Sequence, residues 1–114
     1  MERKSLGFIE ITGVVAALDA LDIMTKSANV SLVTWERKLG GRLVTVVVSG
    51  DIGAVNAAVE NACRLAIKKP AAHLVLAAPH EETWKMVEFS AKRLEKLQKH
   101  EKPDIDDGYQ EVHF

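Results

Sequence analysis

The stretch "VSLVTWERKLGGRLVTVVVSG", residues 30–50, contains two runs rich in β-branched residues, 30–36 and 43–48, on either side of a paired glycine. Such runs are typical of strands, and glycine supplies the positive φ that a tight connection needs. The stretch therefore predicts a hairpin. Its connection, "RKLGGR", carries three cations and no acid after Glu36, which indicates either a solubilising turn or one that faces an anionic species.

Outward from the hairpin, strand-like and helix-like segments alternate. The predicted elements are a strand at 6–12, a helix at 14–27, the strands 30–36 and 43–48, a helix at 51–69, a strand at 71–78 and a helix at 80–100. The β-α-β-β-α-β-α order is the ferredoxin-like, split βαβ pattern with one extra, extended C-terminal helix. We expect an α/β (α+β) domain over residues 5–100 with a four-stranded antiparallel sheet, followed by a tail at 101–114.

Each predicted helix has an apolar stripe at the 3.6-residue period, which we expect to face the core. The stripes are Val14, Leu18, Leu21 and, less strictly, Met24 or Thr25 in the first helix, Ile52, Val55, Val59, Ala62, Cys63 and Ala66 in the second, and Trp84, Val87, Ala91, Leu94 and Leu97 in the third. The last stripe is predicted to pack on its own subunit; the alternative is that it docks a neighbour or a cargo peptide.

Local signals set the expected ends of the helices and the environment of the last strand. Asp51, or Ser49 just before it, is placed to cap the second helix, and Pro70 stops it after two lysines. Pro103 is expected to end the last helix. The run 71–78 is short, apolar and bounded by turn signals, so a buried strand is predicted there.

Composition limits the classes of function. The 114 residues suit a single domain, and the formal net charge of −1 gives no global field for nucleic acid or membranes, so neither is expected as a partner. One cysteine excludes a disulfide within the chain and fits a reducing cytoplasm. The N-terminus lacks the apolar core of a signal peptide, and no run is long enough to span a bilayer.

No catalytic or cofactor-binding set can be assembled from the residues present. The histidines at 73, 80, 100 and 113 are not spaced as metal ligands, and Cys63 on an alanine-rich apolar face is expected to be a core residue. "LGGR" lacks the lysine and hydroxyl residue of a P-loop, and the acid in "SGDIG" would repel an anion at that helix start. We expect no enzyme, no cofactor and no metal.

Four segments in register give a specific resemblance: "LGFIEITG" at 6–13, "KSANV" at 26–30, "LVTV" at 43–46 and "GDIGAV" at 50–55, with "APH" at 78–80 beyond them. In order and spacing they resemble the single-domain, hexamer-forming shell proteins of bacterial microcompartments. The resemblance implies cyclic hexamers that tile into a shell in the bacterial cytoplasm and carry a central pore. It implies partners of three kinds: further copies of this chain, other shell proteins and targeting peptides of encapsulated enzymes.

The same resemblance implies roles for the hairpin connection. In the family the turn between the second and third strands lines the pore, which here is Arg37, Lys38, Leu39, Gly40, Gly41 and Arg42. A sixfold ring of cations would favour small anions. The alternative is that these cations point to solvent or pair with Glu36. The turn is about one residue longer than the common type and lacks its serine.

Hexamer-to-hexamer contacts are implied at four positions. Lys26 and Asn29 match the family's edge lysine and its neighbour, and Ala78 and His80 lie in "AAPH" where the family has "PRPH". For Lys26 the alternative is a solvated cation at a helix end. Ala78 replaces an edge arginine, so lateral contacts are expected to be weaker.

A second function stays open from the residues alone. A ferredoxin-like regulatory domain, trimeric or smaller, would bind a small anionic ligand at the basic loop 37–42. Oligomer size separates this function from the shell function.

Overall fold

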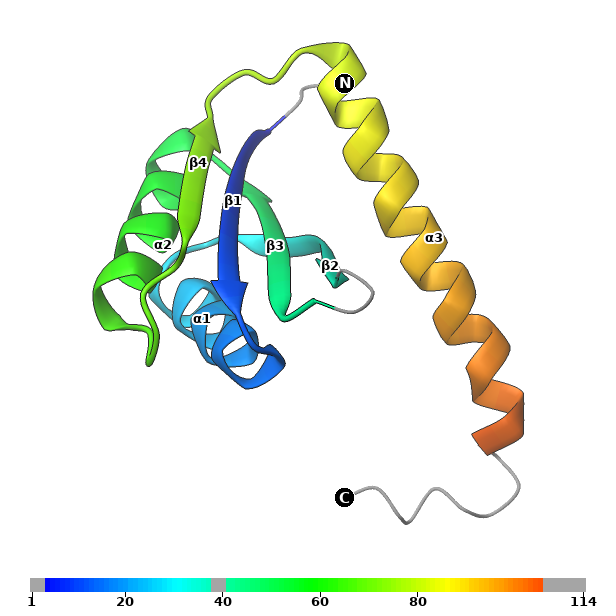
Figure 1. The fold of residues 1–114 in the computed structure, drawn as a ribbon. Helices are drawn as coiled ribbons and strands as arrows, with labels where there is room; N and C mark the ends of the chain where they lie inside the picture. The colour runs from blue at the N-terminus through cyan, green and yellow to red at the C-terminus, as the bar shows by residue number, and fades with distance from the viewer. Residues whose placement is uncertain (1–3, 38–40, 106–114) are drawn as a thin grey trace.

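The computed structural model describes residues 4–37 and 41–105 (Figure 1). Its elements follow the expected order. They are β1 (Ser5–Thr12), α1 (Val14–Ser27), β2 (Ser31–Arg37), β3 (Leu43–Gly50), α2 (Ile52–Leu65), β4 (Ala72–Leu76) and α3 (Glu81–Ile105).

The four strands form one sheet in the order β2-β3-β1-β4, and every neighbouring pair is antiparallel. The expected fold class is confirmed. The strand β1 is central and pairs with β3 and β4, whereas β2 and β4 are the two edges of the sheet.

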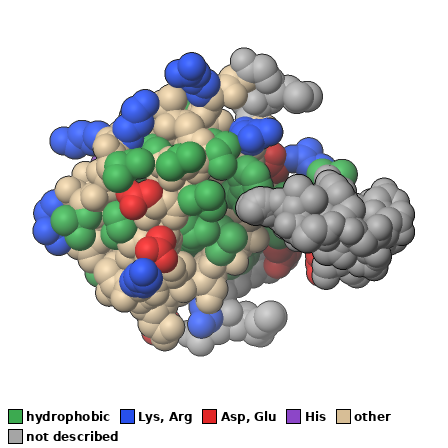
Figure 2. Space-filling model, turned by 90° about the horizontal axis from the view of Figure 1, so that it is seen from below, with side chains coloured by type: hydrophobic (Ala, Val, Ile, Leu, Met, Phe, Trp, Pro, Cys, Tyr) green, Lys and Arg blue, Asp and Glu red, His purple; other side chains and the backbone are tan. Residues whose placement is uncertain are grey.

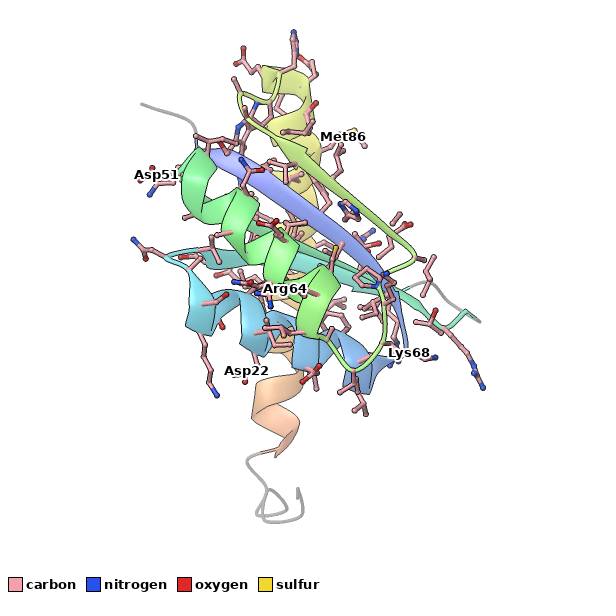
Figure 3. All side chains as sticks on the ribbon, turned by 90° about the vertical axis from the view of Figure 1, so that its left-hand side faces the viewer. Asp22, Asp51, Arg64, Lys68 and Met86 are labelled. Carbon is pink, nitrogen blue, oxygen red and sulfur yellow. The ribbon has the colours of Figure 1, made fainter. Side chains whose placement is uncertain are left out.

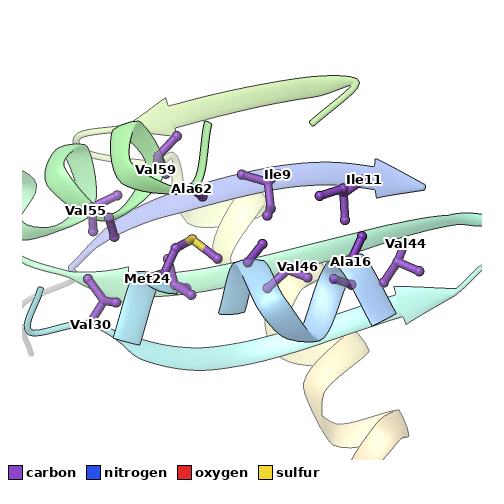
Figure 4. Close-up of a cluster of buried hydrophobic side chains, with 14 residues drawn as sticks. Ile9, Ile11, Ala16, Met24, Val30, Val44, Val46, Val55, Val59 and Ala62 are labelled. Carbon is purple, nitrogen blue, oxygen red and sulfur yellow. The ribbon is translucent and has the colours of Figure 1, made fainter. Parts of the chain in front are cut away.

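Helices cover both faces of the sheet (Figure 1). The helices α1 and α2 pack side by side on one face, called here the α1/α2 face, while α3 crosses the other face against β2 and is called the α3 face. Each face has its own apolar cluster. The larger cluster lies under α1 and α2 (Figure 4), and the smaller one joins Leu6, Val47 and Val87 to Phe8, Val33 and Trp84.

Alternation along β1 supplies both clusters. Leu6 and Phe8 point to the α3 face, and Ile9 and Ile11 belong to the cluster under α1 and α2. Gly7 also faces α2, where an added Cβ would lie 2.8 Å from a methyl of Val55. The missing side chain therefore allows α2 to approach the sheet closely.

A bulge in β2 changes which of its residues share a face. Leu32 pairs with Val48 and Thr34 with Val47, so Val33 is skipped in the ladder. Bulges of this kind put an extra residue on one strand and locally redirect side chains. As a result Val33 joins the cluster under α3, and Leu32 lies on the α1/α2 face with Trp35.

The buried face of α1 differs from the predicted stripe. Alanines at 16, 17 and 20 are buried with Met24, whereas Leu18 is 60% exposed and Leu21 is half-buried. Small residues let α1 lie close to both β3 and α2, and this close packing outweighs the larger apolar side chains. The prediction for Leu18 was wrong for the isolated subunit.

Three further expectations need correction. The helix α2 ends at Leu65, so the lysines at 68 and 69 lie beyond it, and Asp51 precedes it without a side-chain cap hydrogen bond. The strand β4 is not buried, because it is an edge strand whose first three residues are exposed. The helix α3 extends to Ile105, two residues beyond Pro103.

Replacing Gly7 with alanine should destabilise the fold. The new methyl would meet Val55 and Val59 at 2.8 and 2.9 Å, and such overpacking costs about 1–3 kcal/mol. The free energy of unfolding from urea titration measures the loss. Gly53→Ala is the matched control, since nothing lies within 4 Å of its added Cβ and alanine favours a helix. Equal effects of the two substitutions would contradict the close approach of α2.

The thiol of Cys63 should react slowly at neutral pH. Burial raises its pKa, and the nearby charge of Lys69 lowers it by less, so the nucleophilic thiolate is scarce. The pKa of Cys63 is higher in the folded chain than in the unfolded chain. The thiol's contribution to the free energy of unfolding is therefore fully present below the unfolded pKa, and it is lost as the pH rises through the folded pKa. Modification by a disulfide reagent, with and without urea, checks this; equal rates at neutral pH would refute it.

Candidate functional site

The turn between β2 and β3 is described at its two ends. Arg37 is the last residue of β2 and pairs with Val44, and Gly41 and Arg42 precede β3; all three turn residues are exposed. Lys38, Leu39 and Gly40, also predicted to line a pore, lie outside the described residues. The structure thus places the predicted arginines together at one end of the sheet.

The base of this turn is anchored to the junction of β1 and α1. The backbone N–H of Gly13 donates to the carbonyl oxygen of Arg42 at 2.8 Å. Gly13 has a φ of 98°, which only glycine adopts without strain. A sharp corner after β1 therefore supports the backbone at Arg42.

Among the described residues, Glu36 is paired with α3 and not with Arg37 or Arg42 of the turn. Its carboxylate accepts hydrogen bonds from the hydroxyl of Ser90 and from the guanidinium of Arg93, the latter at 2.6 and 2.7 Å. Strand alternation puts Arg37 on the opposite face of the sheet. This pairing could not be predicted from the sequence, because 57 positions separate Glu36 from Arg93 and no local period links them.

The first pair of predicted edge residues follows the end of α1. Lys26 lies in its last turn and forms an exposed ion pair with Asp22 at 3.0 Å. Asn29 is exposed in the connection to β2. Both side chains are accessible, although within the subunit Lys26 already has an i,i+4 partner.

The second pair lies between β4 and α3, where Ala78 and His80 are both exposed. The Nδ1 atom of His80 accepts the backbone N–H of Glu82 at 3.0 Å, which satisfies a free donor in the first turn of α3. His80 therefore has a local role at the helix start in addition to its predicted place at an edge.

The strand register separates the two sets of residues. Ser31 pairs with Ser49 and Leu6 with Leu76, so the segments holding Asn29 and Ala78 adjoin one end of the sheet. The turn 37–42 is at the opposite end, beside the pair Thr12–Leu43. At about 3.4 Å per residue, the length of β3 puts roughly 25 Å between the two ends.

An apolar groove of about 290 Å³ is open between α1 and β2. It is lined by Val14, Ala17, Leu18, Leu21, Leu32, Trp35, Val44 and Val46. Apolar side chains gather on the underside of the molecule, where α1 lies (Figure 2). The groove could not be predicted from the sequence, because Leu18 fits a helical stripe that was expected to face the core.

Four charged side chains on the side of α1 and α2 do not converge on a common site. Asp22, Asp51, Arg64 and Lys68 are spread along that side (Figure 3). Within the described part of the chain, no three His, Cys, Asp or Glu residues could hold a metal ion. Among residues 4–37 and 41–105, no helix is both long enough and apolar enough to cross a membrane.

Comparison with known proteins agrees with this architecture. The family model of the BMC domain matches residues 5–79. The bacterial microcompartment shell protein PduA of Citrobacter freundii is 44% identical over 90 residues, covering 76% of this chain and 95% of that protein. The carboxysome shell protein CsoS1A of Hydrogenovibrio crunogenus is 50% identical over 82 residues, covering 68% and 83%.

A solved structure of a microcompartments protein from Desulfitobacterium hafniense DCB shares the fold, with a TM-score of 0.66 at 22% identity. The match covers 78% of this chain and about half, 49%, of that one. The sequence resemblance is confirmed by the family match across most of the folded domain and by relatives well above 30% identity. The chain belongs to the BMC domain family.

Proposed function

We propose that the protein is a structural shell protein of a bacterial microcompartment. It forms cyclic hexamers that tile into the shell, in the cytoplasm, and the turn 37–42 lines a central pore for small anions. The observation that carries this proposal is the match of residues 5–79 to a family whose relatives here are named shell proteins. The protein catalyses no reaction in this role.

The uncovered apolar surfaces support a ring. On the β2 side, Leu18 and Leu32 are 60% and 41% exposed beside the groove. On the side of the other edge strand, β4, three more apolar side chains are exposed: Leu74 in β4 itself, Leu65 at the end of α2 and Ile67 just after it. Contacts between two different surfaces of one chain are heterologous, and they close into a ring when the rotation allows. The groove is thus proposed to receive the neighbouring subunit.

The charges of the turn support passage of anions. Arg37 and Arg42 are exposed, and neither side chain has an ion-pair partner among the residues that the structure describes. A ring would repeat each arginine around its axis, and such rings favour anions. Lys38, Leu39, Gly40 and Gly41 complete the proposed pore lining.

The opposite end of the sheet suits the outer edge of the disc. Lys26, Asn29, Ala78 and His80 are exposed there and are proposed to meet the next hexamer. The methyl side chain of Ala78 offers no hydrogen-bond donor. His80 uses Nδ1 within its own subunit and keeps only Nε2 for a neighbour. These contacts favour weaker tiling and assembly with other shell proteins; targeting peptides of encapsulated enzymes are further proposed partners.

The alternative is a small regulatory domain that binds an anionic ligand at the turn 37–42. The exposed arginines fit both functions, but the open groove and the family match favour the shell protein. Light scattering on the size-exclusion peak separates them: six copies of the 12.5-kDa chain support the shell, and a trimer or monomer supports the alternative.

Leu18→Glu should break the ring without unfolding the subunit. The side chain is 60% exposed in the isolated chain, so the charge is tolerated there but not beneath a neighbour. The mass from light scattering should fall while the circular dichroism spectrum stays unchanged. Met86→Glu is the control, because Met86 is 75% exposed on α3 and away from the groove. A hexameric Leu18→Glu variant would contradict the proposed interface.

Charge reversal at Arg37, with or without Lys38, should lower anion passage. A glutamate ring at the pore mouth would repel anions that the parent ring attracts. The measurement is the ratio of phosphate to ammonium permeation across reconstituted shells. Lys85→Glu reverses a cation on α3 and should leave the ratio unchanged. The proposal for the pore fails if Arg37→Glu and the double variant retain the parent ratio.

A further inference from the structure

Four polar side chains join α3 to the end of β2 that leads into the turn 37–42. Thr34 and Glu36 come from β2, and Ser90 and Arg93 come from α3. The hydroxyls of Thr34 and Ser90 lie 3.1 Å apart, and Ser90 donates to the carboxylate of Glu36. Thr34 is only 2% exposed, so the cluster reaches from the interior to the surface.

Arg93 completes this cluster at the surface. One guanidinium nitrogen contacts both carboxylate oxygens of Glu36, at 2.6 and 2.7 Å. The guanidinium carbon also lies 6.0 Å from the centroid of the Phe89 ring, within the range of a cation–π contact. Arg93 is therefore held in position from two sides, by an acid on β2 and by a ring one turn earlier on α3.

The position of Glu36 gives this pairing a consequence for the turn. Glu36 directly precedes Arg37, and it is the last acid before the three cations of the connection. Its charge is matched by Arg93 from α3, which leaves the charges of Arg37 and Arg42 uncompensated by Glu36. A second acid, Glu10, lies across Thr45 on the same face, about 10 Å away by strand spacing.

We propose that Arg93 is a specificity-determining residue for anions that meet Arg37 and Arg42, the described arginines at the two ends of the turn. It binds the carboxylate of Glu36 on the α3 face and cancels its charge, and so preserves the attraction of the neighbouring arginines for small anions. The proposal rests on the anion-passing role proposed above for this turn. It assigns to α3 a function beyond packing: this helix sets the charge that a ligand meets at the end of the sheet.

Removing Arg93 should weaken anion binding by releasing a negative charge beside the turn. Inorganic phosphate is the probe, and its dissociation constant is measured at low salt by phosphorus NMR, because salt screens exposed charges. Arg93→Ala should raise that constant on the order of threefold, the size expected for one unit charge acting across several ångströms of surface. Glu36→Gln combined with Arg93→Ala should restore the parent constant, since both charges are then absent.

Lys92→Ala is the matched control. It removes the same unit of positive charge from the adjacent position of α3, and the groups that bind Glu36 remain in place. Its effect on phosphate should be clearly smaller than that of Arg93→Ala. If the two variants match, if the double variant is not rescued, or if the parent chain does not bind phosphate, the inference is overturned.

Light scattering on the same samples keeps the two proposals distinct. If the parent is hexameric and Arg93→Ala does not change its dissociation constant for phosphate, the inference is refuted and the shell function is not affected. A parent that is not hexameric would refute the shell function. The rescue pattern in such a chain would still support the control of the turn's charge by Arg93, as part of a ligand-binding loop. Unfolding of a variant is checked by circular dichroism, and Arg93→Gln replaces Arg93→Ala where that variant unfolds.

Discussion

The close contact between β1 and α2 is the constraint on which the rest of the structure depends. Leu6 and Ile11 are fully buried on opposite faces of β1, so a shift of one residue would exchange the contents of the two cores. Gly7 lets α2 lie against the strand at a distance that no side chain would allow. With β1 and α2 fixed in this way, β3 and β4 have a single register on either side, and α1 takes the remaining space beside α2.

This fixed register also separates the two surfaces of proposed function. The turn 37–42 and the segments around Lys26 and Ala78 adjoin opposite ends of antiparallel strands, so one rigid sheet sets the distance between them. Gly13 anchors the turn from below, and Glu36 ties it to α3. The sheet alone therefore keeps the proposed pore lining separate from the proposed outer edge.

The sequence was sufficient for the order of elements and the sheet, because β-branched runs, glycine and proline act locally. It was insufficient where packing between distant segments determines which residues are buried or paired. Leu18 fits a helical stripe, yet alanines form the buried face because they allow a closer approach. The bulge at Val33 and the pairing of Glu36 with Arg93 leave no periodic signal. The structure places Arg37 and Arg42 at one end of the sheet, and their role in a pore stays a prediction.

The two kinds of proposed contact differ in their physics, and the difference suggests an order of assembly. The proposed contact within a ring is apolar, because it would cover the groove lined by Leu18, Leu21 and Trp35. Burying this apolar surface would stabilise a chain of this size. The proposed contact between rings depends on a few polar groups, and the side chain of Ala78 has no hydrogen-bond donor. Burial is not screened by salt, whereas exposed ion pairs contribute little and are screened. Rings should therefore form first and persist, while tiling responds to salt and to shell proteins that supply the missing donors.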